Sequence, residues 1–397
     1  MLPRRKILVD AALISRVQRT LWGLENFSWF GSDAEQGLNA LLEELEWLWK
    51  QDPFICAEFE ELYASPYADM PVRIGNKERA MMWRNPVGIP AGFTKDGRGA
   101  ETLMHGLRIG CLELGTAPFF PQSGNPEPSF WTDYSLFDNG VFYTLNRFGF
   151  NTRHGIIPLA HRIWDLRDTS ECAVTPLIVS IGPNKIALEE YEENRNLAGL
   201  IRHLMLSCAV ILPALREGDA LQINVSSPNT AGLRNLLNRV FELLRCFMQE
   251  LRALAKICGC PEPVVILKLS PDMPDDDIRQ SATAATLCGV AILETFNTTV
   301  DVGIKARYGI TEAGGVGGDP LRELAEAKLG VIMDEIDKWN LDIDVIACGG
   351  ITEPEHALAR LAMHPRVKAV QINSGIYKKG FWLIKDTLAA IHASRAV

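Results

Sequence analysis

The segment NVSSPNTAGLRN, residues 224–235, carries more hydrogen-bonding side chains than an ordinary turn requires. It continues from LQI at 221–223, which has the apolar character of a buried strand. Asparagine offers both donors and an acceptor, and serine offers a hydroxyl group. We therefore interpret the segment as part of a site that grips a small polar molecule.

Other asparagines support this interpretation. Asn146 in LNRFGFN and Asn297 in FNTTV stand, like Asn224 and Asn229, at the ends of apolar runs or in adjoining loops. Each asparagine alone is more typical of a turn. Together, converging amides suit a planar ligand that bears several carbonyl and N–H groups.

Two lysines are further candidates. Lys268 lies inside the apolar run VILKLSP, where an unpaired ammonium group would be costly. We expect it to point into the mouth of the fold, toward an electron-rich cofactor ring. The alternative is a lysine that reaches solvent at a strand end. Lys95, in PAGFTKDG, has a weaker case, because lysine is common in glycine-rich loops.

Glycine-rich segments predict a phosphate site. Gly349 and Gly350 stand in ACGGITEPEHA, Ser374 and Gly375 in INSGIYKKG, and EAGGVGGDP occupies residues 312–320. A tight turn would explain one such pair. Backbone amides near helix N-termini, however, form the phosphate cradle in the last loops of a barrel. We therefore expect a phosphorylated cofactor.

The elements that must position these residues alternate between short apolar runs and amphipathic segments such as 234–257 and 320–339. Such runs are typical of parallel strands covered on both faces. The predicted strands are 87–92, 111–116, 177–182, 221–227, 264–270, 290–297, 344–350 and 369–375. This pattern predicts an α/β fold, a (β/α)8 TIM barrel, with a doubly wound sheet as the alternative. The polar residues at the strand ends favour the barrel, which binds ligands there.

Residues 1–69 are predicted to form an N-terminal helical extension, and residues 70–397 the barrel domain, whose base is closed by a hairpin at 70–86. The segment 33–52 has leucines along one side, which we expect to pack on the barrel. The alternative is a membrane interface, because the tryptophans and phenylalanines of residues 1–69 lie near basic residues.

Composition excludes several classes of protein. The chain has 397 residues, a net charge of −9 and no long basic run, which argues against a nucleic-acid partner. Its nine cysteines are scattered and predict reduced thiols, with no metal site. It contains no run of 18 apolar residues, so no membrane-spanning helix is expected. Asp10, Arg16 and Arg19 interrupt the segment after the basic start, so no cleaved signal peptide is expected.

The chain resembles the dihydroorotate dehydrogenases, the flavin enzymes of pyrimidine biosynthesis. The resemblance extends over about residues 84–380, three quarters of the chain, in the order found in that family. The matching motifs are NPVGIPAGFTKDG, GNPEPS, LNRFGFNTRHG, INVSSPNTAGLRNL, VILKLSPD, FNTTV, GGVGGDPLREL and ACGGITEPEHAL. The combination of N-x-SSPNT, NTT and two late GG loops is specific to the family.

The resemblance also implies a branch of the family. Ser227 stands where the soluble branch has a catalytic cysteine, as in the branch that passes electrons to a membrane quinone. That branch also carries an N-terminal helical extension. The resemblance therefore implies a cytoplasmic oxidoreductase, or one placed peripherally on the inner face of the membrane through residues 1–69.

Roles of individual residues follow from the same resemblance. Ser227 would remove the proton from C5 of dihydroorotate, helped by Thr230 and Phe150, while hydride passes from C6 to N5 of FMN. The residues that would hold the substrate are Lys95, Asn146, Asn224, Asn229, Asn297 and Thr298. The residues that would contact FMN are Ala91, Gly92, Thr116, Ser180, Asn224, Lys268, Gly318, Gly349, Gly350, Asn373 and Ser374.

Several positions depart from the pattern of the family. They are Thr94, Phe119, Phe120, Glu127, Ser129, Ser180, Gly317, Asn373 and the long loop at 133–143. Several of them cluster where the outer edge of the flavin and the electron acceptor are expected. One alternative is therefore a related FMN-dependent oxidoreductase that acts on another dihydropyrimidine or a specialised metabolite with a different electron acceptor. A second is a barrel that has lost catalysis and serves as a scaffold.

Overall fold

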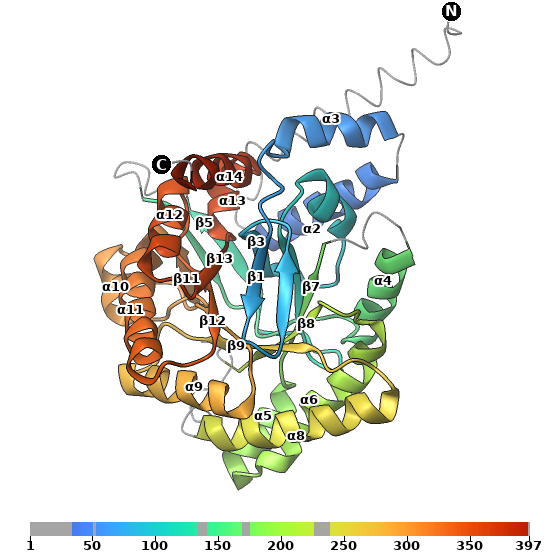
Figure 1. The fold of residues 1–397 in the computed structure, drawn as a ribbon, viewed down its shortest axis with the longest axis vertical. Helices are drawn as coiled ribbons and strands as arrows, with labels where there is room; N and C mark the ends of the chain where they lie inside the picture. The colour runs from blue at the N-terminus through green and yellow to red at the C-terminus, as the bar shows by residue number, and fades with distance from the viewer. Residues whose placement is uncertain (1–33, 51–52, 134–140, 169–174, 226–238, 396–397) are drawn as a thin grey trace, which may run out of the picture.

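Eight parallel strands form a closed barrel in the computed structural model, which describes residues 34–50, 53–133, 141–168, 175–225 and 239–395 (Figure 1). Their order around the barrel is β3-β4-β7-β8-β9-β10-β12-β13. The strands are β3 (Val87–Thr94), β4 (Cys111–Ala117), β7 (Leu177–Ile181), β8 (Ala220–Asn224), β9 (Val264–Leu269), β10 (Ile292–Thr295), β12 (Asp344–Cys348) and β13 (Val367–Gln371). Each overlaps a predicted run, so the barrel prediction is confirmed and the doubly wound alternative is wrong.

Helices surround the barrel and cover the outer face of its strands (Figure 1). They are α4 (Ile157–Asp168), α5 (Lys185–Asn194), α6 (Leu197–Ile211), α8 (Val240–Cys258), α9 (Asp275–Cys288), α11 (Arg322–Trp339), α12 (Pro354–Met363) and α14 (Trp382–Arg395). Two short helices, α10 (Val302–Arg307) and α13 (Ser374–Lys379), follow β10 and β13. Shorter turns occupy Thr102–Gly106, Leu212–Ala214 and Asp319–Leu321. Because the strands are covered on both faces, nearly every strand residue of the barrel is buried.

The helical segment Leu197–Ala214 is long and apolar enough to cross a membrane by composition. It is nevertheless a helix of the outer ring, and Leu200, Leu204 and Cys208 on its inner side are fully buried. Packing against the barrel therefore accounts for its apolar character.

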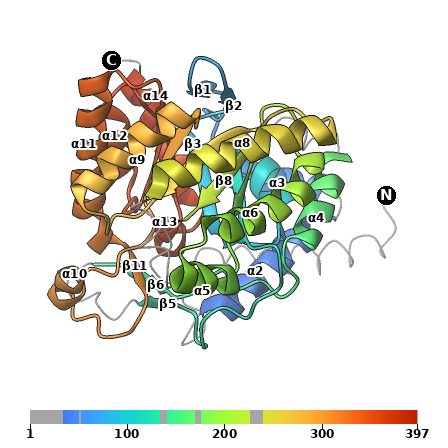
Figure 2. The same ribbon diagram turned by 90° about the horizontal axis from the view of Figure 1, so that it is seen from below.

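The inside of the barrel consists of stacked layers of side chains. An apolar layer lies at the amino-terminal end, and strands β1 (Val72–Gly75) and β2 (Ala80–Trp83) form a hairpin over it. Ile74, Met81 and Trp83 of this hairpin are fully buried against the apolar layer, as the predicted closure of the base requires. Figure 2 shows the hairpin at one end of the barrel and strands β5, β6 and β11 at the other.

A polar layer lies two residues further along each strand. Because side chains alternate between the faces of a strand, residues two apart point the same way. The seven members of this polar layer, all buried, are Glu113, Ser180, Gln222, Lys268, Glu294, Cys348 and Gln371. They form the floor beneath the carboxyl-terminal mouth of the barrel.

A small antiparallel sheet covers part of the mouth. It consists of β5 (Phe130–Asp133), β6 (Tyr143–Asn146) and β11 (Gly315–Gly318). The sequence predicted a loop for the last segment, which is wrong: the glycines form a strand. The reason is close packing, since a Cβ atom on Gly317 would lie 2.7 Å from Ser374 Oγ and 2.8 Å from Thr144 Oγ1.

Helices α2 (Ala34–Trp49) and α3 (Pro53–Tyr63) precede the barrel strands. The leucine face of α2 packs into the barrel core, with Leu38, Leu42, Leu45 and Leu48 at most 3% exposed. This face is therefore not available to a membrane. The result agrees with the predicted packing of segment 33–52 on the barrel.

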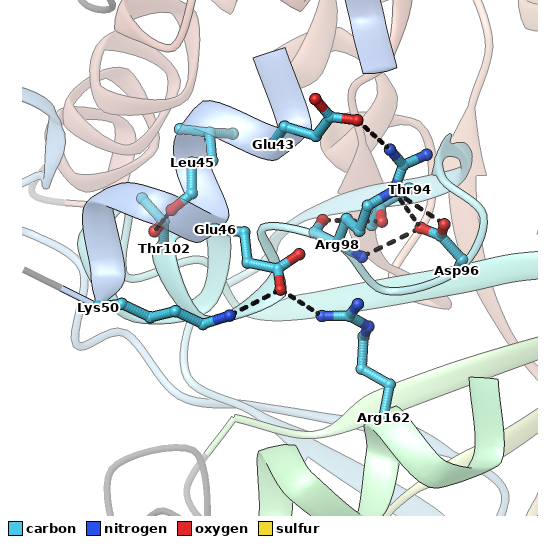
Figure 3. A network of polar contacts seen from close by, with 9 residues as sticks. All are labelled: Glu43, Leu45, Glu46, Lys50, Thr94, Asp96, Arg98, Thr102 and Arg162. Carbon is cyan, nitrogen blue, oxygen red and sulfur yellow. Dashed lines mark hydrogen bonds and ion pairs between the residues drawn. The ribbon is translucent and has the colours of Figure 1, made fainter. Parts of the chain in front are cut away.

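Polar contacts fix the position of α2 along the barrel (Figure 3). Glu46 pairs with Lys50 at 2.9 Å and with Arg162 of α4 at 3.1 Å. Arg98 of the loop after β3 pairs with Glu43 at 3.2 Å. The hydroxyl group of Thr102 donates to the carbonyl oxygen of Leu45 at 2.6 Å.

Gly99 allows the backbone of this loop to approach α2. Its φ is +68°, and an added Cβ atom would lie 2.9 Å from Leu45 Cβ and 3.2 Å from the carbonyl oxygen of Leu42. Gly309 has a nearly equal φ of +66° but no atom within 4 Å of the same position.

We predict that Gly99→Ala lowers the free energy of unfolding by about 1–3 kcal/mol more than Gly309→Ala. Both substitutions introduce the strain of a left-handed alanine, at about 1–2 kcal/mol, so their difference isolates the clash with α2. Urea denaturation of both variants measures it. Equal losses of stability would show that α2 does not depend on this close approach.

Candidate active site

A cavity opens at the carboxyl-terminal mouth of the barrel, above the polar layer. Its walls come from the ends of β3, β4, β8, β9 and β13, from the small sheet and from the loops after β10 and β12. Barrel enzymes bind their ligands at this end. The cavity is therefore the candidate active site.

Most of the residues predicted for the site line this cavity. They are Ala91, Gly92, Lys95, Thr116, Asn146, Phe150, Asn224, Lys268, Asn297, Thr298, Gly318, Gly349, Gly350, Asn373 and Ser374. Ser180 does not: it is fully buried in the polar layer below. Ser227, Asn229 and Thr230 lie outside the described residues.

Lys268 is the charged group at the centre of the floor. Its side chain is 3% exposed and donates to Glu294 Oε1, while Glu113 Oε1 lies 3.8 Å from its Nζ atom. Burial alone would lower the pKa of Lys268, but the negative charge of the neighbouring carboxyl pair, Glu113 and Glu294, outweighs burial and raises it. The lysine is therefore protonated inside the barrel.

Glu113 completes this group of charges. Burial, and after it the charge of Glu294, raises the pKa of Glu113 to about 8. Its second oxygen accepts a hydrogen bond from Gln371 Nε2 at 3.1 Å. At neutral pH Glu113 thus keeps its proton, and Lys268 and Glu294 form a single buried ion pair.

Hydrogen bonds connect the floor with the wall of the cavity. Gln222 donates to Glu294 Oε2 and accepts from Ser180 Oγ at 2.6 Å. Ser180 Oγ lies 2.8 Å from Thr116 Oγ1, which accepts from Asn224 Nδ2 at 2.8 Å. A continuous chain of polar contacts thus leads from the buried charges to a predicted ligand-binding amide.

A second charged cluster surrounds Lys95 at the side of the cavity. Its Nζ atom donates to Asn151 Oδ1 at 2.6 Å and to Glu35 Oε1 at 2.7 Å, and lies 3.5 Å from the centroid of the Phe148 ring. The other oxygen of Glu35 accepts a hydrogen bond from Ser129. Because Glu35 belongs to α2, the N-terminal helix contributes directly to the wall beside the site.

The opposite side of the cavity is suited to a phosphate group. Gly349 and Gly350 have φ values of +96° and +73°, which L-residues with side chains rarely adopt. Ser374 begins α13, and its Oγ lies 2.7 Å from Thr144 Oγ1. Freed backbone amides and hydroxyl groups of this kind bind phosphate.

The floor and wall also offer unused polar atoms. Gln371 Oε1 and Asn373 Oδ1 are buried without a hydrogen-bond partner among the described residues, although both side chains line the cavity. Such atoms are costly unless a ligand satisfies them. The residues present therefore fit a planar, hydrogen-bonding cofactor that carries a phosphate, as the sequence predicted.

Sequence reasoning missed Glu35, Glu113, Gln222 and Glu294. A signal was present for two of them, because CLELGT and VAILETFN each place one carboxylate in a run that reads as a buried strand. A buried charge requires a partner. Lys268 in the run VILKLSP offered one, and matching these runs would have predicted the ion pair.

Comparison with known proteins agrees with the geometry. Residues 77–394 match the family model described as dihydroorotate dehydrogenase. A mouse protein named dihydroorotate dehydrogenase (quinone), mitochondrial, is 32% identical over 288 residues, which cover 70% of this chain and 66% of the mouse protein. A Pseudomonas aeruginosa protein named dihydroorotate dehydrogenase (quinone) is 32% identical over 334 residues, 82% of this chain and 86% of the bacterial protein.

A solved structure has the same fold. The crystal structure of DHODH in complex with ferulenol from Eimeria tenella matches with a TM-score of 0.68 at 22% identity. The match covers 90% of this chain and 96% of that one.

We predict that Glu113 makes the protein less stable as pH rises. A carboxyl group whose pKa is raised from 4.5 to about 8 stabilises the folded state fully below pH 4.5, and this contribution is lost as pH rises through 8. Relative to Glu113→Gln, the wild type should lose on the order of a few kcal/mol between pH 5 and pH 9. Urea denaturation across this range tests the prediction, and parallel pH profiles would contradict it.

Proposed function

The chain belongs to the dihydroorotate dehydrogenase family, and from this premise we propose that it oxidises (S)-dihydroorotate to orotate in pyrimidine biosynthesis, with FMN as cofactor and a quinone as electron acceptor. The observation that carries the proposal is the cavity itself. It brings Lys95, Lys268 and the amides of Asn146, Asn224 and Asn297 together at the mouth of one barrel.

The floor and the glycine side of the cavity would hold FMN, which when bound supplies an acceptor for hydride. Gly318, Gly349, Gly350 and Ser374 are suited to its phosphate. Gln371 and Asn373 present unpaired side-chain oxygens, and Lys268 presents a positive charge from below. These groups orient a flat ring above the polar layer.

The upper wall would hold the substrate. Asn146, Asn224 and Asn297 offer donors and acceptors to its ring, and Lys95 offers a cation to its carboxylate. The resemblance to the family supplies the base, Ser227, with Thr230 and water as the relay that takes up its proton and Phe150 as the aromatic residue beside that relay. A serine hydroxyl is a weak base, so these neighbours are needed to activate it.

We assign the quinone to the side of the cavity that faces α2. The helix contacts the site there through Glu35, which accepts a hydrogen bond from Ser129. The sequence departs from the family at Ser129 and Glu127, so the acceptor side of this protein has its own chemistry. We also propose that residues 1–69 place the protein peripherally on the inner face of a membrane, through groups other than the buried leucines of α2.

Glu35 favours a second candidate substrate. Glu35 already pairs with Lys95 and therefore opposes the binding of a substrate carboxylate at that lysine. The alternative substrate is a related dihydropyrimidine that lacks a carboxylate. The affinity for orotate distinguishes the two, because a site tuned to an uncharged ring binds orotate weakly.

Spectroscopy of the purified protein tests the proposed function. We expect a yellow protein whose absorbance near 450 nm falls when dihydroorotate is added without oxygen and returns with a quinone. The rate of dihydroorotate oxidation should fall about 10²- to 10⁴-fold in Ser227→Ala, while the variant still binds orotate. A protein that binds FMN but is not reduced by dihydroorotate would overturn the proposal.

We predict that Glu35→Gln strengthens orotate binding by about three- to tenfold, because Lys95 loses a competing carboxylate at 2.7 Å. Glu46→Gln is the matched control: Glu46 lies on the same helix, with its side chain 19% exposed against 18% for Glu35, and pairs outside the cavity. Orotate titration of flavin absorbance measures both. Weaker binding by Glu35→Gln would show that the carboxylate orients Lys95 instead.

A further inference from the structure

Glu294 is held from two sides in the polar layer. One carboxylate oxygen accepts from Lys268, and the other accepts from Gln222, whose own oxygen accepts from Ser180 at 2.6 Å. Glu294, Gln222 and Ser180 are all 0% exposed. A carboxylate fixed in this way has a single orientation, with one oxygen toward the lysine.

The direct contact of Glu294 with a residue that lines the cavity is its ion pair with Lys268. The two residues are register partners on neighbouring strands β10 and β9. Lys268 lines the cavity, whereas Glu294 lies beneath it. The other path, through Gln222, Ser180 and Thr116, consists of neutral groups, so the main effect of Glu294 on a bound ring is on the position and net charge of the ammonium group.

A buried ammonium attracts electron density far more strongly when it is unpaired than when a carboxylate offsets it, because the surrounding dielectric is low. We infer that Glu294 is a positioning residue that fixes Lys268 beneath the cofactor and offsets its charge, and thereby lowers the cofactor's reduction potential. This inference rests on the proposed FMN site. It predicts a weaker preference for the reduced cofactor than Lys268 alone would give.

Any test of this inference must prevent Glu113 from ionising in place of Glu294. It lies 3.8 Å from the same ammonium group and would ionise to replace Glu294 if that charge were removed. Glu113→Gln keeps the neutral form that the carboxyl group has at pH 7, since its pKa is raised to about 8 by burial and by Glu294. This variant is therefore the reference.

The experiment is a redox titration of FMN-loaded variants at about pH 5 and about pH 7 against a dye of known potential, because burial lowers the pKa of a lysine that has lost both carboxylates. At the lower pH, where Lys268 keeps its proton, adding Glu294→Gln to the reference should raise the ratio of affinities for reduced over oxidised FMN about tenfold. For a two-electron couple this equals about 30 mV. An unchanged or lower potential would overturn the inference.

A further variant guards against misfolding, because an unpaired buried lysine destabilises a protein. Replacing Lys268 and Glu294 together by Gln in the reference removes the ion pair as a unit. Because Glu294 offsets much of the charge of Lys268, the ratio of affinities for reduced over oxidised FMN should fall by no more than about threefold relative to the reference. A large fall would show that Lys268 acts as an uncompensated charge, and the inference would fail.

Glu335→Gln in the reference is the matched control. Glu335 is 7% exposed on α11 and accepts from Thr283 Oγ1 at 3.1 Å, away from the cavity. Its removal should leave the potential unchanged. A wild-type protein that takes up no FMN would refute the proposed function itself. Normal FMN uptake and dihydroorotate oxidation with no response to Glu294→Gln would refute only this inference.

Discussion

A protonated lysine inside a barrel needs a carboxylate within contact distance, and the pairing of Lys268 with Glu294 meets this need. The rest of the floor follows from that pair. Gln222 fixes the carboxylate, Glu113 keeps a proton, and Gln371 satisfies the second oxygen of Glu113. A positive charge can therefore stand beneath the cavity although the Lys268 side chain is only 3% exposed.

The surrounding elements bury this floor. The outer helices cover the strands, and the β1–β2 hairpin covers the apolar layer below the charges. Above them, the glycines of β11 and of the loop after β12 let backbone groups approach a ligand. Helix α2 is the one element from outside the barrel whose charged side chain, Glu35, contacts the cluster around Lys95 among the residues described here.

The sequence was most informative where a single periodicity dominates. All eight barrel strands lie at predicted apolar runs, because strands covered on both faces need little else to specify them. The lining residues were found because polar groups at strand ends meet in a barrel. The partners of those residues were harder to predict: the contact between Lys95 and Glu35 joins positions 60 residues apart, and periodicity carries no information about such a distance. The strand at Gly315–Gly318 was missed because glycine has low strand propensity, and only packing against Thr144 and Ser374 explains it.

The hairpin at the base determines by which end of the barrel small molecules can reach the cavity. Its Gly75 N–H donates to Asp344 at the start of β12, and its apolar side chains fill the amino-terminal end, so the part of the barrel that the structure describes is closed at that end. The substrate, which donates electrons, and the molecule that accepts them must both enter through the carboxyl-terminal mouth. The substrate and the electron acceptor must therefore either bind one after the other at the same mouth or enter it from different sides.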